Sequence, residues 1–234
     1  VAILDKAFAA IDIAKANAQQ NLQNSKELFE SCLQNIFENK GDDWEQKGLG
    51  EVCDFVQGIQ RGVKLQSEIC SKGQVRFLRI IDFTQGKEPP RYIDNPGDKY
   101  IMNKKDVSLV RYGASTGFVC QGKEGALANN LFRVKPKSEQ ELLNDFLFVF
   151  LTSPVFQNII KASMNGAAMP AISFGLIKDI KFPVISINKQ NEIIKKLNAL
   201  STETKKLEVI YTKKIADLEE MKKSVLQKAF SGQL

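Results

Sequence analysis

Two long stretches without a single glycine or proline, residues 3–38 and 188–230, constrain most strongly how this chain can fold. Both stretches are rich in Ala, Leu, Gln, Glu and Lys, which favour helix, whereas Gly and Pro interrupt it. The sequence therefore predicts one long helix near each end of the chain. At about 1.5 Å per residue, about 40 residues make a rod of roughly 60 Å.

The second of these helices carries a heptad pattern, which is typical of a coiled coil. Its expected seam consists of Ile193, Leu197, Leu200, Thr204, Leu207, Tyr211, Lys214, Leu218, Met221 and Val225. The first helix repeats apolar or small residues at Leu4, Ala7, Ile11, Ala14, Ala18, Leu22, Leu28, Cys32 and Ile36. Because one helix enters the middle segment and the other leaves it, we expect an antiparallel coiled coil. The alternative is that both helices pack flat on the middle segment as ordinary core.

The two helices also resemble each other in sequence. Residues 31–37 match residues 224–230 at an offset of 193 (224 − 31), and the same offset pairs Leu4 with Leu197 and Glu27 with Glu220. Several matches in one register indicate a duplicated unit.

The middle of the chain has a different composition. All seven Pro and thirteen of the fifteen Gly lie within residues 44–187. Short β-type runs at 75–83, 107–112, 117–120 and 130–134 are followed by helical patterns at 139–152 and 154–164. The sequence therefore predicts an α+β fold with three parts: a helix in 1–42, one α+β globule in 43–187 and a second helix in 188–234.

Several classes of function find no support in the residues. The chain has no His, and its four Cys form no C-x-x-C pair, so we expect no metal site and no histidine base. Residues 95–97 lack the second Pro and the aromatic residue of an amino-methyltransferase motif, and residues 113–117 lack the third Gly of a dinucleotide loop. We therefore predict a chain that is not an enzyme and binds no cofactor.

The compartment and the extent of the chain are further expectations. The sequence contains neither a run of about 20 apolar residues nor a signal-peptide pattern, so we expect no membrane association and a cytoplasmic location with reduced thiols. Because the chain begins within an amphipathic pattern and without Met, we expect it to be a piece of a longer protein.

Charge favours a polyanionic partner. The net charge is +6, and residues 43–187 carry nineteen Lys and Arg against fifteen acids, a difference of +4. A positive excess of this kind supports contact with phosphates, which provides affinity for DNA without sequence preference.

Seven segments in order resemble the specificity subunits of type I restriction–modification systems. They are residues 44–58, 77–83, 106–119, 165–170, 177–180, 190–193 and 226–234. The resemblance covers essentially the whole chain, and it identifies residues 43–187 as a target recognition domain.

The resemblance implies both architecture and partners. A full specificity subunit has two recognition domains, each followed by a long helix, and each domain recognises one half of a bipartite DNA site. A methyltransferase (modification) subunit and a restriction/translocase subunit supply the chemistry. This chain, with one domain between two helices, is expected to be the C-terminal half of a subunit or a naturally half-sized one. Its expected partners are double-stranded DNA, these two subunits and a second copy in a two-fold dimer.

Recognition of bases needs Arg, Lys, Asn, Gln, Ser or Thr on loops that can enter a groove. The candidates are Arg111, Tyr112, Gly113, Ser115 and Thr116 in one glycine-containing segment, Gln57, Gln60 and Arg61 in a second, and Arg79, Lys104, Lys105 and Asn165 elsewhere. Each has a plainer alternative. The first segment can be a hairpin turn with a solvated arginine, the second a surface loop, and Asn165 part of a connector. Arg79 and Asp82 are expected on opposite faces of one strand, so the alternative for Arg79 is a buried ion pair with another residue.

Partner contacts are expected at the matched ends of the two helices, on Phe29, Leu33, Phe37, Leu226 and Phe230. The competing hypothesis for the whole chain is a coiled-coil dimerisation or interaction protein whose globule does not bind DNA. Retention on DNA that falls with salt concentration separates the two.

Overall fold

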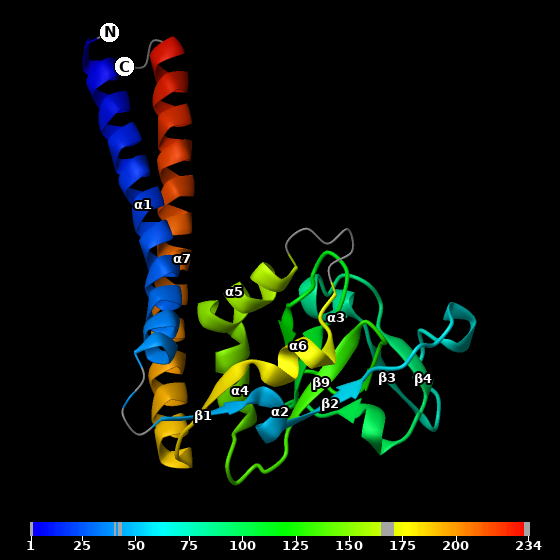
Figure 1. The fold of residues 1–234 in the computed structure, drawn as a ribbon. Helices are drawn as coiled ribbons and strands as arrows, with labels where there is room; N and C mark the ends of the chain where they lie inside the picture. The colour runs from blue at the N-terminus through cyan, green and yellow to red at the C-terminus, as the bar shows by residue number, and fades with distance from the viewer. Residues whose placement is uncertain (1, 40, 42–43, 165–170, 232–234) are drawn as a thin grey trace. The chain divides into compact units, whose positions relative to one another are not determined.

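The computed structural model describes residues 2–39, 41, 44–164 and 171–231, and these form two compact units. One unit is a pair of helical segments, residues 1–33 and 195–234, and the other is the globule of residues 34–194. The long helices are α1 (Ala2–Glu38) and α7 (Ile187–Phe230), which confirms both helices expected from the sequence (Figure 1).

Within the helical unit, α1 and α7 lie side by side and run in opposite directions (Figure 1). Lys15 pairs with Glu219 at 2.7 Å, and Asp12, one turn earlier in α1, accepts a hydrogen bond of 2.7 Å from Lys222, one turn later in α7. The Lys222 ammonium also lies 5.7 Å from the centre of the Phe8 ring. The contacts are antiparallel, whereas the knobs-into-holes packing that defines a coiled coil stays a prediction.

The buried side of α7 follows the expected heptad seam from Ile193 to Thr204, where Ile193, Leu197 and Thr204 are buried and Leu200 is half-buried. Farther along, Tyr211, Leu218 and Val225 are half-buried, as predicted. At the positions between these the prediction is wrong by one residue: Leu207, Lys214 and Met221 are exposed, while Glu208, Ile215 and Lys222 are half-buried. In α1, Leu28 is likewise exposed, and Ser25 and Phe29 take the inner positions.

The described residues of the globule form two four-stranded sheets and one two-stranded sheet. The first four-stranded sheet has the order β2 (Cys53–Gln57), β9 (Leu131–Pro136), β6 (Val107–Val110) and β7 (Val119–Cys120), all antiparallel. The second has the order β4 (Arg91–Asp94), β3 (Gln74–Leu78), β8 (Gly125–Leu127) and β5 (Ile101–Met102), with β3 and β8 parallel. The small sheet pairs β1 (Glu45–Gly48) with β10 (Lys181–Val184).

Short helices complete the globule: α2 (Leu49–Val52), α3 (Ile80–Thr84), α4 (Asn144–Thr152), α5 (Pro154–Ser163) and α6 (Phe174–Asp179), with single turns η1 (Val63–Leu65) and η2 (Asp98–Tyr100). Of the predicted runs, the strand at 130–134 and the helix at 154–164 are confirmed to within two residues, and the strands at 107–112 and 117–120 are present but shorter, because β6 ends at Val110 and β7 begins at Val119. The helix predicted for 139–152 begins only at Asn144.

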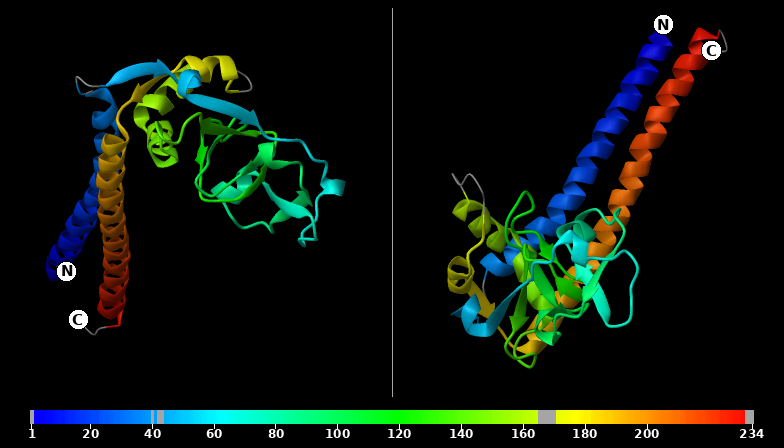
Figure 2. Two further views of the ribbon diagram at one scale, coloured as in Figure 1. Left: turned by 90° about the horizontal axis from the view of Figure 1, so that it is seen from below. Right: turned by 90° about the vertical axis from the view of Figure 1, so that its right-hand side faces the viewer.

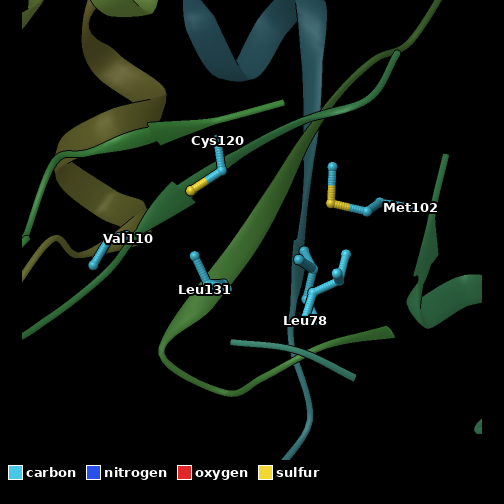
Figure 3. Packing of buried hydrophobic residues seen from close by; sticks show 6 residues of the cluster. Leu78, Met102, Val110, Cys120 and Leu131 are labelled. Carbon is cyan, nitrogen blue, oxygen red and sulfur yellow. The ribbon is translucent and has the colours of Figure 1, made fainter. Parts of the chain in front are cut away.

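The two larger sheets share one apolar core. Leu78, Met102 and Leu127 come from one sheet, and Val110, Cys120 and Leu131 come from the other. Figure 3 shows these side chains gathered between the strands. Because both sheets bury one face in the same cluster, the loops at their edges are held on a common support.

Both long helices contribute their globule-side ends to the second unit. Phe37 packs against Phe146 and Phe150, with ring centres 5.8 and 5.3 Å apart. Gln190 accepts a hydrogen bond from the Leu143 amide at 2.9 Å and donates to the Glu141 carbonyl at 2.7 Å. The compact units therefore divide inside the helices, near residues 33 and 195, whereas the boundaries at 42 and 187 remain our proposal for the domains.

Candidate nucleic-acid interface

Arg111, the residue first expected to contact bases, follows β6 and is held by three groups from distant parts of the globule. Its Nη1 donates to the Gln57 side-chain oxygen at 2.7 Å, and its Nε donates to the Ile172 carbonyl at 3.2 Å. Its guanidinium lies 5.1 Å from the centre of the Phe174 ring, within the range of a cation–π contact. The structure thus brings together two of the predicted residues, Arg111 and Gln57.

The partners of Arg111 are themselves fixed. The Gln57 amide nitrogen donates to the carbonyls of Asn129 and Leu131. Phe174 stacks on Phe55 with ring centres 5.9 Å apart. Phe174 escaped the sequence analysis because a contact between residues 63 positions apart (174 − 111) leaves no local pattern.

This network limits what Arg111 can do in its present position. A bidentate contact to guanine needs two guanidinium N–H donors. The Nε donor is used by Ile172 and one Nη1 donor by Gln57, while Nη2 has no hydrogen bond to any residue that the structure describes. Arg111 therefore holds β6, β2 and the start of α6 together, and three of its five N–H donors remain for a ligand.

The segment after Arg111 forms a turn between β6 and β7, as the plainer alternative had it, although Arg111 itself is hydrogen-bonded and not merely solvated. Gly113 and Gly117 adopt φ of +100° and +89°, which glycine accepts without steric cost. The Gly113 carbonyl accepts from both the amide and the hydroxyl of Thr116, at 3.1 and 2.6 Å. Gly113 is exposed, and Tyr112 and Ser115 are half-buried, so a preformed turn presents its backbone to solvent.

Arg79 takes part in an internal ion-pair network. The predicted strand over 75–83 is wrong beyond Leu78, because the Asp82 carboxylate accepts the Arg79 amide at 2.8 Å and so starts helix α3. The Arg79 guanidinium donates to Asp82 at 3.1 Å, to Glu88 at 2.9 Å and to the Pro89 carbonyl at 3.0 Å. Each of its three nitrogens donates to one of these groups, so the network fixes the position of the guanidinium, and only the second N–H of Nη1 and of Nη2 is left for a DNA contact.

Lys104 and Lys105 project from the turn between β5 and β6. The Asn103 side chain accepts the Lys105 amide at 2.8 Å, and the Asp106 carboxylate accepts the Asn103 amide at 2.8 Å. Arg133, which the sequence analysis missed, pairs with the buried Asp106 at 3.2 Å. Neither lysine forms an ion pair within the described residues, so both ammonium groups are available to phosphate.

Two further candidates, Gln60 and Arg61, are exposed in the connection between β2 and β3. Asn165 lies outside the described residues. Among the described residues, no group of His, Cys, Asp and Glu could hold a metal ion. Within the same residues no single helix is long and apolar enough to cross a membrane, although the bent pair α4–α5 passes that test of length and composition.

The cysteines are four free thiols. Burial raises the pKa of Cys53 and of Cys120 from 9.0 to about 12, so both thiols stay protonated at neutral pH. A thiol in this state is a poor nucleophile and a poor metal ligand.

The residues expected to contact a partner subunit differ between the two helices. Leu226 and Phe230 near the end of α7 are 45% and 85% exposed. Leu33 and Phe37 are buried, so the expected exposure of the matched residues in α1 is wrong; Phe37 is enclosed by Trp44, Phe146 and Phe150. Phe29 is half-buried.

Known proteins share this fold and sequence pattern. The chain is 22% identical over 194 residues to the specificity subunit of the type I restriction enzyme MjaVIII from Methanocaldococcus jannaschii. It is 23% identical over 202 residues to the EcoBI specificity subunit from Escherichia coli. The matches cover 81% and 82% of this chain but 42% of each relative, so the chain spans less than half the length of these relatives.

Solved structures show the same fold at 17% identity. One, which addresses complex assembly and conformational transition of the type I R-M system, matches with a TM-score of 0.82 over 100% of this chain and 58% of its own. The HsdS subunit from Thermoanaerobacter tengcongensis matches with a TM-score of 0.68, over 100% of this chain and 57% of its own. The model of the type I restriction modification DNA specificity domain matches residues 41–217, and the chain belongs to this family.

Proposed function

We propose that this chain recognises DNA sequence as one recognition module of a type I restriction–modification specificity subunit, and that it is not itself an enzyme. The observation that carries the proposal is the family match over residues 41–217, which includes the whole described globule from Trp44 onward. The module contacts one half of a bipartite site in double-stranded DNA. Methyltransferase and restriction subunits supply the chemistry, and the assembly works in the cytoplasm.

The geometry supports two separate roles within the module, contact with phosphates and contact with bases. Lys104 and Lys105 offer unpaired charges that suit phosphates, which position a protein on DNA without selecting a sequence. The turn at 113–117 and the remaining donors of Arg111 are suited to base edges in the major groove. The two sheets that share the core hold both elements.

The helical unit is the proposed docking surface for the modification subunit. Leu226 and Phe230 expose apolar side chains near the end of α7, and Leu207 and Met221 add exposed apolar residues along it. An exposed apolar face on a helix pair fits a helical groove of a partner. The same surface supports our proposals of coiled-coil packing and of a two-fold dimer.

DNA binding tests the function. The chain, purified together with its modification subunit, should retain a mixed 40-base-pair duplex pool at low salt, and retention should fall linearly on a log–log plot as salt rises. Sequencing of methylated positions in cells that express the pair should give one interrupted motif. A chain that neither retains duplex nor directs methylation would instead be the interaction protein with a globule that does not bind DNA.

A further inference from the structure

The connection between β2 and β3, residues 58–73, exposes three large apolar side chains to water. Val63 is 75% exposed, Leu65 68% and Ile69 81%. Single exposed apolar residues are ordinary, but a cluster of them marks a surface that meets a partner. In Figure 1 and in the left view of Figure 2, turn η1 reaches out beyond the strands of the β4-β3-β8-β5 sheet. We call residues 61–69 the apolar tip.

Hydrogen bonds hold this tip in one shape. The Leu65 amide donates to the Gly62 carbonyl at 2.9 Å, and the Gln66 side chain donates to the Arg61 carbonyl at 2.8 Å. Ser67 and Tyr92 exchange two backbone hydrogen bonds, at 2.9 and 2.8 Å, which fix the returning arm to β4. A tip that is already ordered loses little conformational entropy when it binds.

The charge around the tip selects the kind of partner. Residues 58–73 contain three basic residues, Arg61, Lys64 and Lys72, and one acid, Glu68. The Glu68 carboxylate pairs with Arg91 at 2.9 Å, so its charge is compensated. A surface that is both apolar and basic matches duplex DNA, which offers phosphates beside base edges, thymine methyl groups and separable base steps.

We propose that the apolar tip enters a groove of the bound duplex, with Val63 and Leu65 against the bases and Lys64 and Lys72 against flanking phosphates. This inference rests on the proposed DNA-binding function and adds a second base-contacting element, separate from Arg111 and its turn. Apolar contact with bases contributes sequence preference, while the lysines add affinity for every sequence.

Two variants of the whole chain, each bound to the modification subunit, separate these roles. Val63→Ser/Leu65→Ser keeps the charge, and it should lower affinity for a duplex bearing the methylated motif about tenfold or more without changing the salt dependence. Lys64→Gln/Lys72→Gln should weaken motif and random duplexes equally and lower the log–log salt slope by about two. Ile159→Ser, which changes an exposed apolar residue on α5, is the matched control and should bind as the unmodified chain does.

The outcomes are distinct. If the unmodified chain binds the motif duplex and both tip variants bind it equally well, the tip does not contact DNA and this inference is overturned. If the serine variant instead loses the modification subunit, the tip is a protein-docking site, which also overturns it. If the unmodified chain itself binds no duplex, the proposed DNA-binding function is wrong, and the inference that rests on it is wrong as well. Thermal unfolding of the two tip variants should match that of the unmodified chain, because the replaced side chains are exposed to water.

Discussion

At the scale of single residues, the main finding is that the arginine best placed to contact bases also holds the module together. Arg111 joins Gln57 of one segment to Ile172 and Phe174 of another. In the proposed interface, such a residue would act on DNA through the geometry it maintains as well as through its own remaining donors.

Substitutions at Arg111 and Gln57 should therefore interact. Arg111→Ala should cost about 1–3 kcal/mol of affinity for the motif duplex and relax discrimination at one base pair. Gln57→Ala should have a smaller effect in the same direction. In a double-mutant cycle measured by anisotropy, the two losses should not add, because they break the same hydrogen bond. If the Arg111→Ala variant binds motif and random duplexes with the affinities of the unmodified chain, this turn contacts no bases.

The buried thiols predict a dependence of stability on pH. Cys53 and Cys120 keep their protons up to about pH 12 in the folded chain, whereas unfolded thiols lose them above about 9.0. The unfolded state then binds fewer protons than the folded state, so this contribution is complete below pH 9 and falls as pH rises from 9 to 12. Urea unfolding of a Cys53→Ala/Cys120→Ala variant should show a weaker decline across this window than that of the unmodified chain.

At the scale of elements, the turn at 103–106 is suited to bind phosphate. Lys104→Gln/Lys105→Gln should weaken binding to all duplexes about equally and lower the salt slope by about two. The exposed neighbours Lys195 and Lys196 on α7 give the matched control, Lys195→Gln/Lys196→Gln, which should leave the slope unchanged. If the log–log salt slope is the same for the unmodified chain and for both lysine variants, Lys104 and Lys105 do not contact DNA.

The sequence predicted elements where a local pattern is sufficient. Both long helices follow from the absence of Gly and Pro, and α5 follows Pro154 at its first position. The strand expected over 75–83 failed because Asp82 forms contacts with Arg76 and Arg79 that favour helix, a tertiary effect that propensity does not include. Strand β8 has only three residues and pairs in parallel with β3, so the sequence contains no alternation of apolar and polar residues that would predict it. The pairing of Arg111 with Gln57 depended on the order of strands in the sheet, which the sequence does not reveal.

At the scale of the whole molecule, the helix pair is the contact that we propose for the modification subunit. Leu226→Asp/Phe230→Asp should abolish the complex with the modification subunit in co-purification, because it places two charges in an apolar contact. The globule should remain folded, since both residues are exposed in the helical unit. Phe118→Asp, which changes an exposed residue of the globule, is the control and should leave the complex intact. If Leu226→Asp/Phe230→Asp still co-purifies with the modification subunit, that subunit does not bind this part of α7.

Association of the chain with itself is also expected at this scale. The duplicated motif at 31–37 and 224–230 and the exposed apolar residues of α7 favour a two-fold, self-closing contact over a filament. Sedimentation at micromolar concentration should give twice the monomer mass of 26.2 kDa. A single species of monomer mass would contradict the dimer.

The antiparallel pairing of α1 and α7 also determines how the helical unit responds to force. Asp12 contacts Lys222 and Lys15 contacts Glu219, so the N-terminal turns of α1 and the C-terminal turns of α7 lie at the same end of the helix pair. Tension applied between the two termini would load the inter-helix contacts one after another. The two helices would therefore separate progressively, at low force. In a parallel helix pair pulled from opposite ends, the same tension would load all the inter-helix contacts at once.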